Sequence, residues 1–374
     1  MKIKRLISVL LAAVFVVGII AGTSVSASDT EKIKNVIFMI GDGMGENNIN
    51  YAKAAEKRSL TMEVFPIRGQ SETRSSSNRV TDSAAGGTAL SCGIRTTNGC
   101  VGVFPLDPLD LFVSPKSLTE RAAESGMKTG VITSDSTSGA TPASFSVHTS
   151  SRKNEKDISV QQMHSVFDII WGAASESVTQ SEVEANGFTY INDINGMNAL
   201  ESGSRSFGQF AGDTWSSSPE LDTTPTLSEM TEKSISLLSG SDKGFFLMVE
   251  GAHIDKFAHS NKGEEMTEAL YEFDNAVSIA LNFALRDRHT LIVITADHET
   301  GAIQLIDGEY QFTSGSHTGN NVPVFVYGST EIINNGQAIK NREVSNHVAS
   351  ALGFHSGTNP GRIALFFKNL FNRV

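Results

Sequence analysis

The sequence is poor in cysteine, in positive charge and in long apolar segments. Of its 374 residues only two are cysteine, and 30 lysines and arginines stand against 41 aspartates and glutamates, a formal net charge of −11. This acidity disfavours nucleic-acid binding through a basic surface, so we expect no nucleic-acid partner. It would also repel an anionic substrate, unless the site held strong local positive charge such as bound metal ions supply.

The two cysteines, Cys92 and Cys100, leave the disulfide content open. In an exported protein, a disulfide that closes the short loop between them is chemically permitted. Two buried free thiols fit the sequence as well.

Long apolar runs are scarce, and the clearest one lies at residues 6–20. It follows the basic segment 1–5 and precedes the small residues at 25–27, an order typical of a secretory signal peptide. A membrane anchor is the alternative, but the run is short for a spanning helix. We therefore expect a signal peptide at residues 1–27, no membrane association after its removal, and export to the periplasm or the extracellular medium.

Three further apolar runs predict buried strands that end in acidic residues. Continuous apolar runs are typical of strands covered on both faces of a parallel sheet. Ligands of such sheets bind beyond the carboxyl ends of the strands. Each run leads within two residues to an acid: residues 36–40 to Asp42, residues 245–249 to Glu250, and residues 291–295 to Asp297.

Helical patterns lie between these strands. Ser117 and Glu120 form a capping box, and residues 264–287 carry one apolar stripe. Alternating strands and helices predict an α/β fold with a largely parallel sheet, and the length suits a single catalytic domain over residues 28–374. Residues from about 173 to 224 are polar and aperiodic, which predicts a loop-rich insertion near the site.

Several histidines and carboxylates have the spacing of metal ligands. Asp255 and His259 lie four residues apart, so one helical turn or a compact loop could direct both to one ion. His317, in a flexible polar segment, is a candidate third ligand. Mixtures of histidine and carboxylate suit zinc with an open coordination position.

The adjacent Asp297 and His298 could turn toward a second ion at the end of their strand. Each candidate ligand taken alone is more often a turn, cap or core residue. Together with Asp42 and Glu250, the candidates would concentrate more charge than a fold tolerates without metal ions.

Asp82 and Ser83 precede a run of small, helix-compatible residues. A serine at a helix start faces unpaired N–H groups and the positive end of the helix dipole, which favour its alkoxide and any phosphate that it receives. The alternative is that both residues only cap the helix. The remaining motifs favour a nucleophilic serine.

The chain resembles the alkaline phosphatases, in order from Asn35 to its carboxyl-terminal part. The resemblance rests on linked motifs: Ile40-Gly41-Asp42-Gly43-Met44-Gly45, Thr81-Asp82-Ser83-Ala84-Ala85, Ala140-Thr141-Pro142-Ala143-Ser144-Phe145, Ser151-Arg152, Glu250-Gly251-Ala252-His253-Ile254-Asp255, Thr295-Ala296-Asp297-His298-Glu299-Thr300-Gly301 and His317-Thr318-Gly319. It implies a three-layer αβα sandwich and a phosphomonoesterase with two zinc ions and one magnesium ion.

The resemblance also implies a role for each matching residue. Ser83 would be phosphorylated and then dephosphorylated, Arg152 would hold two phosphate oxygens, and Asp82 would orient Arg152. The ligand sets would be Asp255, His259 and His317 for the first zinc, Asp42, Asp297 and His298 for the second, and Asp42, Thr141 and Glu250 for magnesium.

The chain departs from the family at Gly139, where relatives commonly carry aspartate or histidine near the third metal. This weakens the magnesium assignment. Lys256, by contrast, matches a lysine that some bacterial members place near the phosphate through water. The resemblance allows a homodimer, although the chain is short for the family and could lack the peripheral insertions that support dimers elsewhere.

Two other functions compete with this interpretation. One is a related enzyme of the same superfamily, such as a phosphodiesterase, a sulfatase or a phosphoglycerate mutase. A sulfatase requires the motif Cys/Ser-x-Pro-x-Arg, and the residues that follow Ser83 do not match it. An exported zinc- or phosphate-binding protein without turnover would explain the ligands but not a helix-start serine in register with Arg152.

Overall fold

The computed structural model describes residues 32–106, 111–175, 177–211 and 223–354. The chain divides into two units, Met1–Lys32 and Ile33–Val374, and the second contains all the elements below. The expected signal peptide at residues 1–27 lies outside the described residues. Within those residues, no helix is both long enough and apolar enough to cross a membrane.

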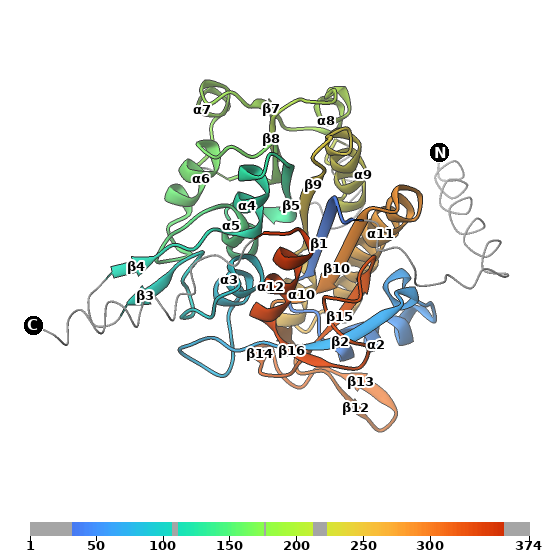
Figure 1. The fold of residues 1–374 in the computed structure, drawn as a ribbon. Coiled ribbons are helices and arrows are strands. Elements are labelled where there is room, and N and C mark those ends of the chain that lie inside the picture. Colours follow the sequence, from blue (N-terminus) through green and yellow to red (C-terminus); the bar gives the residue numbers. More distant parts are fainter. Residues whose placement is uncertain (1–31, 107–110, 176, 212–222, 355–374) are drawn as a thin grey trace, which may run out of the picture. The chain divides into compact units, whose positions relative to one another are not determined.

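One large sheet forms the centre of the second unit (Figure 1). β15 runs antiparallel to both of its neighbours, and the other neighbouring pairs among the described strands are parallel. The strand order is β16 (Ala338–Lys340), β2 (Ile67–Glu72), β15 (Val322–Tyr327), β10 (Thr290–Thr295), β1 (Asn35–Gly41), β9 (Phe245–Gly251), β5 (Lys128–Ser136), β6 (Ile169–Ala173), β8 (Ser206–Phe210) and β7 (Thr189–Ile191).

Helices cover both faces of this sheet. One face packs against α2 (Glu46–Glu56), α9 (Leu227–Leu238) and α11 (Gly263–Asp287), and the other against α3 (Ser83–Cys92), α4 (Leu118–Glu124), α5 (Ala140–Ser146) and α12 (Asn341–Ala351). Successive side chains of β1 alternate between these two cores, with Ile37 and Met39 in one and Val36, Phe38 and Ile40 in the other. The predicted three-layer αβα fold is confirmed.

The local signals explain where these elements begin and end. The apolar stripe of α11 buries Met266, Leu270, Phe273 and Val277. Ser117 caps α4, because its hydroxyl accepts a hydrogen bond from the Glu120 amide while the Glu120 carboxylate accepts one from the Ser117 amide.

The segment from about residue 173 to 224, where the sequence predicts a loop-rich insertion, forms short elements in its described part. They are α7 (Gln180–Ala185), β7, α8 (Ile194–Ala199) and β8, and the two strands extend the sheet at one edge. Elements of three to six residues are too short to show a sustained hydrophobic period.

Smaller elements surround the sheet. α10 (His253–His259) follows β9, and the two-residue strands β11 (Glu299–Thr300) and β14 (His317–Thr318) pair antiparallel. The others are η1 (Thr61–Val64), α6 (Glu155–Met163) and the antiparallel pairs β3 (Phe104–Leu106) with β4 (Leu111–Val113) and β12 (Gln304–Ile306) with β13 (Glu309–Gln311).

Candidate metal and phosphate site

Three neighbouring strands carry acidic residues to one edge of the sheet. β10, β1 and β9 are parallel neighbours, so their carboxyl ends lie together. Asp42 follows β1, Glu250 lies in the last part of β9, and Asp297 follows β10. All three are buried, with 7%, 2% and 0% of their surface exposed. Such burial is costly for carboxylates unless positive charge compensates them.

His298 joins Asp42 and Asp297 in one group. Its Nε2 atom lies 3.2 Å from Asp297 Oδ2 and 3.6 Å from Asp42 Oδ1. Asp297 Oδ2 and Asp42 Oδ1 are both buried, and neither accepts a hydrogen bond from the residues that the structure describes. Two orphaned carboxylate oxygens thus face one imidazole nitrogen.

Thr300 determines which nitrogen of His298 carries the proton. The Thr300 hydroxyl donates its hydrogen to Asp255 Oδ1, and its oxygen lies 3.3 Å from His298 Nδ1. Since that hydrogen is already used, Thr300 can only accept from His298, so Nδ1 carries the proton. Nε2 therefore points at the orphaned oxygens of Asp42 and Asp297 and is the nitrogen available to bind a cation.

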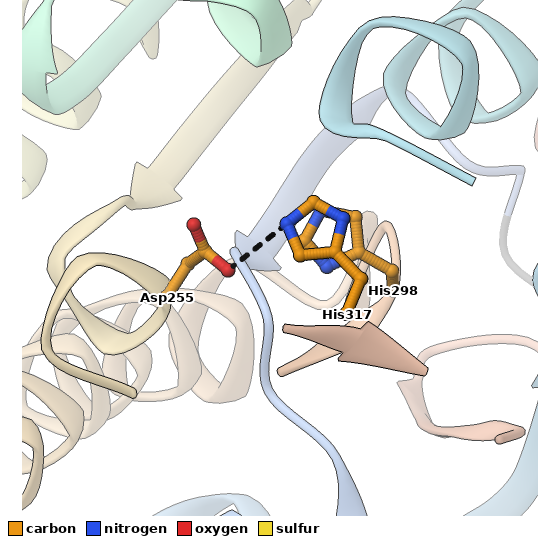
Figure 2. A group of neighbouring side chains, drawn as sticks. All are labelled: Asp255, His298 and His317. Carbon is orange, nitrogen blue, oxygen red and sulfur yellow. Dashed lines mark ion pairs between the residues drawn. The ribbon is translucent and has the colours of Figure 1, made fainter. Parts of the chain in front are cut away.

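Asp255, His259 and His317 form a second group. α10 places Asp255 and His259 one turn apart, with His259 Nε2 3.3 Å from Asp255 Oδ2. β14 brings in His317, whose Nε2 lies 3.6 Å from Asp255 Oδ1. Figure 2 shows this pair beside the His298 ring, which stacks on His317 at 3.5 Å between ring centres. The two groups are therefore adjacent.

Backbone carbonyls orient both histidines of the second group. His259 Nδ1 donates to Gly315 O at 2.7 Å, and His317 Nδ1 donates to Thr81 O at 3.0 Å. The two Nε2 atoms then face each other at 3.0 Å. Metal-binding histidines typically have this arrangement, with the other ring nitrogen held by a carbonyl or carboxylate.

The donor sets of both groups fit divalent cations. The ligand atoms of Asp42, Asp297 and His298 lie within 4.8 Å of one another, and those of Asp255 and His317 lie equally close to His298. In the second group, His259 Nε2 lies 3.3 Å from Asp255 Oδ2 and 3.0 Å from His317 Nε2. Imidazole with carboxylate is the donor mixture that suits zinc. A cation in each group would satisfy the orphaned oxygens and the facing lone pairs.

The pKa values of two of these residues are shifted by burial and by their charged neighbours. Burial, together with the charges of Asp297, Asp255 and Glu250, raises the pKa of Asp42 well above its usual value. In the second group, the hydrogen bond to Asp255 raises the pKa of His259 to about 9. Both shifts show that the two groups favour added positive charge, from a proton or from a cation.

A third set of oxygens lies around Glu250. Burial raises the pKa of Glu250 to about 8, although the Thr133 hydroxyl donates a hydrogen bond to its carboxylate. Thr141, in the first turn of α5, donates to Asp42 Oδ2 at 3.5 Å. Asp42, Thr141 and Glu250 are therefore neighbours and offer oxygen ligands only, which is the donor set that magnesium prefers.

Ser83 is the first residue of α3 and is buried beside the first group. Asp82 caps the helix through its Oδ1 atom, which accepts from the Ala85 amide at 3.0 Å. Ser83 Oγ lies 3.2 Å from His298 Nε2, the same nitrogen that faces Asp42 and Asp297. The hydroxyl therefore lies between the helix N-terminus and the candidate cation position.

Arg152 is held next to this serine. Its Nη1 atom donates to Asp82 Oδ2 at 3.3 Å, and its backbone amide donates to Gly99 O at 2.8 Å. The Gly99 amide in turn donates to Asp82 Oδ2 at 3.0 Å. The guanidinium is thus oriented on one side and leaves donors for an anion on the other.

Lys256 is the remaining predicted site residue. It belongs to α10, and its Nζ atom lies 2.5 Å from Asp135 Oδ1. The structure therefore pairs Lys256 with an aspartate that the sequence did not indicate.

Gly139 is the N-cap of α5, and a Cβ atom there would first meet Ser136 O, at 3.0 Å.

Sequence analysis missed the residues that orient the ligands. Thr300 lies within a quoted motif, but no sequence pattern shows that it bridges Asp255 and His298. Thr133 and Asp135 lie in a serine- and threonine-rich stretch without a recognisable motif. The two cysteines, Cys92 and Cys100, are free thiols.

Comparisons with known proteins identify the family of this chain. The family model described as alkaline phosphatase matches residues 33–170 and 172–314. Alkaline phosphatase 4 of Bacillus subtilis (strain 168) is 32% identical over 332 residues, covering 81% of this chain and 71% of the relative.

Solved structures give the same result. Alkaline phosphatase from the Antarctic bacterium TAB5 is 30% identical with a TM-score of 0.77, covering 87% of this chain and all of that one (100%). A variant of the TAB5 enzyme with Mg bound in its M3 site is 30% identical with a TM-score of 0.75, covering 87% and 99%. The chain therefore belongs to the alkaline phosphatase family, as the sequence predicts, and is a phosphatase enzyme.

Proposed function

We propose that this phosphatase hydrolyses phosphate monoesters by transferring the phosphoryl group first to Ser83 and then to water. One observation carries the proposal. Ser83 Oγ lies 3.2 Å from the His298 nitrogen that also faces the orphaned oxygens of Asp42 and Asp297. A nucleophilic hydroxyl, a helix N-terminus and a cation position thus meet at one point.

Enzymes of this family are metal-dependent, and the donor sets support the following ligands. Divalent cations bound there would supply Lewis acidity and positive charge to the reacting phosphoryl group. One zinc ion would be held by Asp255, His259 and His317, a second by Asp42, Asp297 and His298, and a magnesium ion by Asp42, Thr141 and Glu250.

The chain's own residues bind and orient the phosphate. The free N–H groups of Arg152 hold two phosphate oxygens, because Asp82 fixes the plane of the guanidinium. The first turn of α3 presents the Ser83 hydroxyl, and the dipole of this ten-residue helix favours the negative charge that develops on it. Lys256 adds a further positive charge at the edge of the site.

The proposed substrates are small phosphate monoesters, since recognition rests on the phosphoryl group itself. The net charge of −11 gives no basis for a nucleic-acid partner. Export after cleavage of residues 1–27 and formation of a homodimer remain predictions.

A chemical trap tests the proposal. Zinc- and magnesium-loaded protein is mixed with a radiolabelled aryl phosphate monoester, quenched in acid and digested, and the labelled peptide is sequenced. We expect label on Ser83 and faster release from the monoester than from the matching diester. Label on another residue, or turnover without a labelled peptide, would contradict the proposed intermediate.

A further inference from the structure

The Lys256–Asp135 ion pair joins two elements at the rim of the site. Lys256 comes from α10, directly after the ligand Asp255, and Asp135 comes from the end of β5. Their Nζ and Oδ1 atoms lie 2.5 Å apart, and their side chains are 42% and 25% exposed. The pair is therefore within reach of solvent and of a ligand entering the site.

Asp135 is also connected to Glu250, through hydrogen bonds of Thr133 in β5. Thr133 is the register partner of Glu250, and its hydroxyl donates to the Glu250 carboxylate. The same hydroxyl oxygen accepts from the Asp135 amide at 3.1 Å. The negative charge of Asp135 is among the causes that raise the pKa of Glu250. Asp135 is thus an acidic neighbour of Glu250, reached through one threonine.

Position 139 supplies no comparable group. Gly139 has no side chain, and its φ of −52° is one that other residues adopt freely. The φ angle therefore does not require glycine, although a Cβ atom there would lie 3.0 Å from Ser136 O, so a side chain would need a small local shift. Within the described residues of β5 and α5, Asp135 is the acidic residue that lies near Glu250.

We propose that Asp135 is a positioning residue that holds Lys256 at the phosphate site and acts, through water, as an outer carboxylate for the third cation. The inference rests on the proposed function, because it needs a cation near Glu250. Magnesium keeps several waters when bound, so a carboxylate outside direct contact can still anchor it through those waters. Pairing with Asp135 also confines the flexible Lys256 side chain.

The charges predict effects of opposite sign. Asp135→Asn keeps the shape but removes the charge, so magnesium binding to zinc-loaded protein should weaken, by about 10- to 100-fold for an outer-sphere partner. Lys256→Met removes the cation that partly neutralises Asp135, so magnesium binding should tighten. The double variant Asp135→Asn/Lys256→Met should bind magnesium like Asp135→Asn alone. Once Asp135 has lost its charge, removing Lys256 exposes no carboxylate charge that could strengthen magnesium binding.

Isothermal calorimetry and the magnesium-dependent rise in melting temperature measure these affinities without turnover. Asp157→Asn is the matched control, because Asp157 lies on α6, outside the metal-ligand groups, and its carboxylate accepts a hydrogen bond from Gln161 Nε2 at 3.0 Å. Adding Gly139→Asp to Asp135→Asn should restore part of the affinity.

The outcomes separate the inference from the proposed function. Equal magnesium affinity in wild type, Asp135→Asn and Lys256→Met would overturn the inference while leaving Ser83 chemistry intact. A wild-type protein that binds zinc but no magnesium would overturn both the third site and the role of Asp135. Weaker binding in Asp135→Asn with tighter binding in Lys256→Met would support the inference, because a purely structural role would not reverse the sign.

Discussion

His259 Nε2 and His317 Nε2 face each other at 3.0 Å, while the other nitrogen of each ring is held by a backbone carbonyl. Two imidazole lone pairs at this distance repel each other unless a proton or a cation lies between them. The fold itself holds the rings in this position, since His259 lies on α10 and His317 on β14. The fold therefore sets up a binding position for positive charge.

Removing one of these rings should empty one zinc position. We expect His317→Ala to lose about one of two zinc ions, because only Asp255 and His259 then remain in that group. His164→Ala is the control, since His164 is exposed and contacts the Val160 carbonyl outside both groups. Metal content by mass spectrometry measures the loss, and equal zinc content in the two variants would refute the ligand assignment.

Ser83→Ala should abolish turnover without emptying the metal positions. The variant loses the nucleophile, which costs several orders of magnitude in kcat. The cation ligands of both groups remain, so zinc content should match wild type. Steady-state kinetics and metal analysis on the same preparations test this, and near-normal kcat would exclude Ser83 as the nucleophile.

Arg152→Lys should weaken phosphate binding although the charge is kept. A lysine cannot replace the planar fork that Asp82 orients, so the inhibition constant for inorganic phosphate should rise about 10-fold. Lys153→Ala serves as the control, because Lys153 is exposed and adjacent in sequence. If Arg152→Lys binds phosphate as well as the control does, the bidentate role is wrong.

The metal-free protein should become less stable as the pH rises above neutrality. Burial raises the pKa of Glu250 from 4.5 to about 8, and the hydrogen bond to Asp255 raises that of His259 from 6.5 to about 9. Both groups bind protons more tightly in the folded state, so the stability that they contribute is lost as pH rises through these folded values. Burial lowers the pKa of His317 below 6.5, so its opposite effect falls at lower pH.

Bound cations should suppress this loss, because they bind ionised Glu250 and neutral His259. Melting temperatures of chelator-treated and metal-loaded protein, measured from about pH 7 to about pH 9, test the difference. We expect a steeper fall for the chelated protein. Parallel curves would show that these groups do not bind the cations.

The sheet and the acidic strand ends could be predicted because burial on both faces leaves a direct signal. β1, β9 and β10 are fully buried, so their sequences are continuous apolar runs that stop where Asp42, Glu250 and Asp297 begin the site. The stripe of α11 could be predicted because one face of this helix is buried, which repeats apolar residues at the helical period. These signals depend on many residues of one type in a regular order.

The orientation of the ligands could not be predicted, because it depends on single contacts between distant segments. The two-residue strands β11 and β14 have no periodic pattern, yet their pairing places Thr300 opposite His317. The Asp135–Lys256 pair joins residues far apart in the chain, and although Lys256 matches a lysine of the family, Asp135 lies outside every motif. Such contacts follow from tertiary packing, which local sequence does not encode.

The central claim is that two zinc ions lie next to Ser83, and anomalous X-ray diffraction at the zinc absorption edge tests it most directly. Crystals of zinc-loaded protein should give one peak among Asp255, His259 and His317 and a second among Asp42, Asp297 and His298, beside Ser83 Oγ. Strong peaks only elsewhere, or none in a protein that hydrolyses phosphate monoesters, would contradict the account.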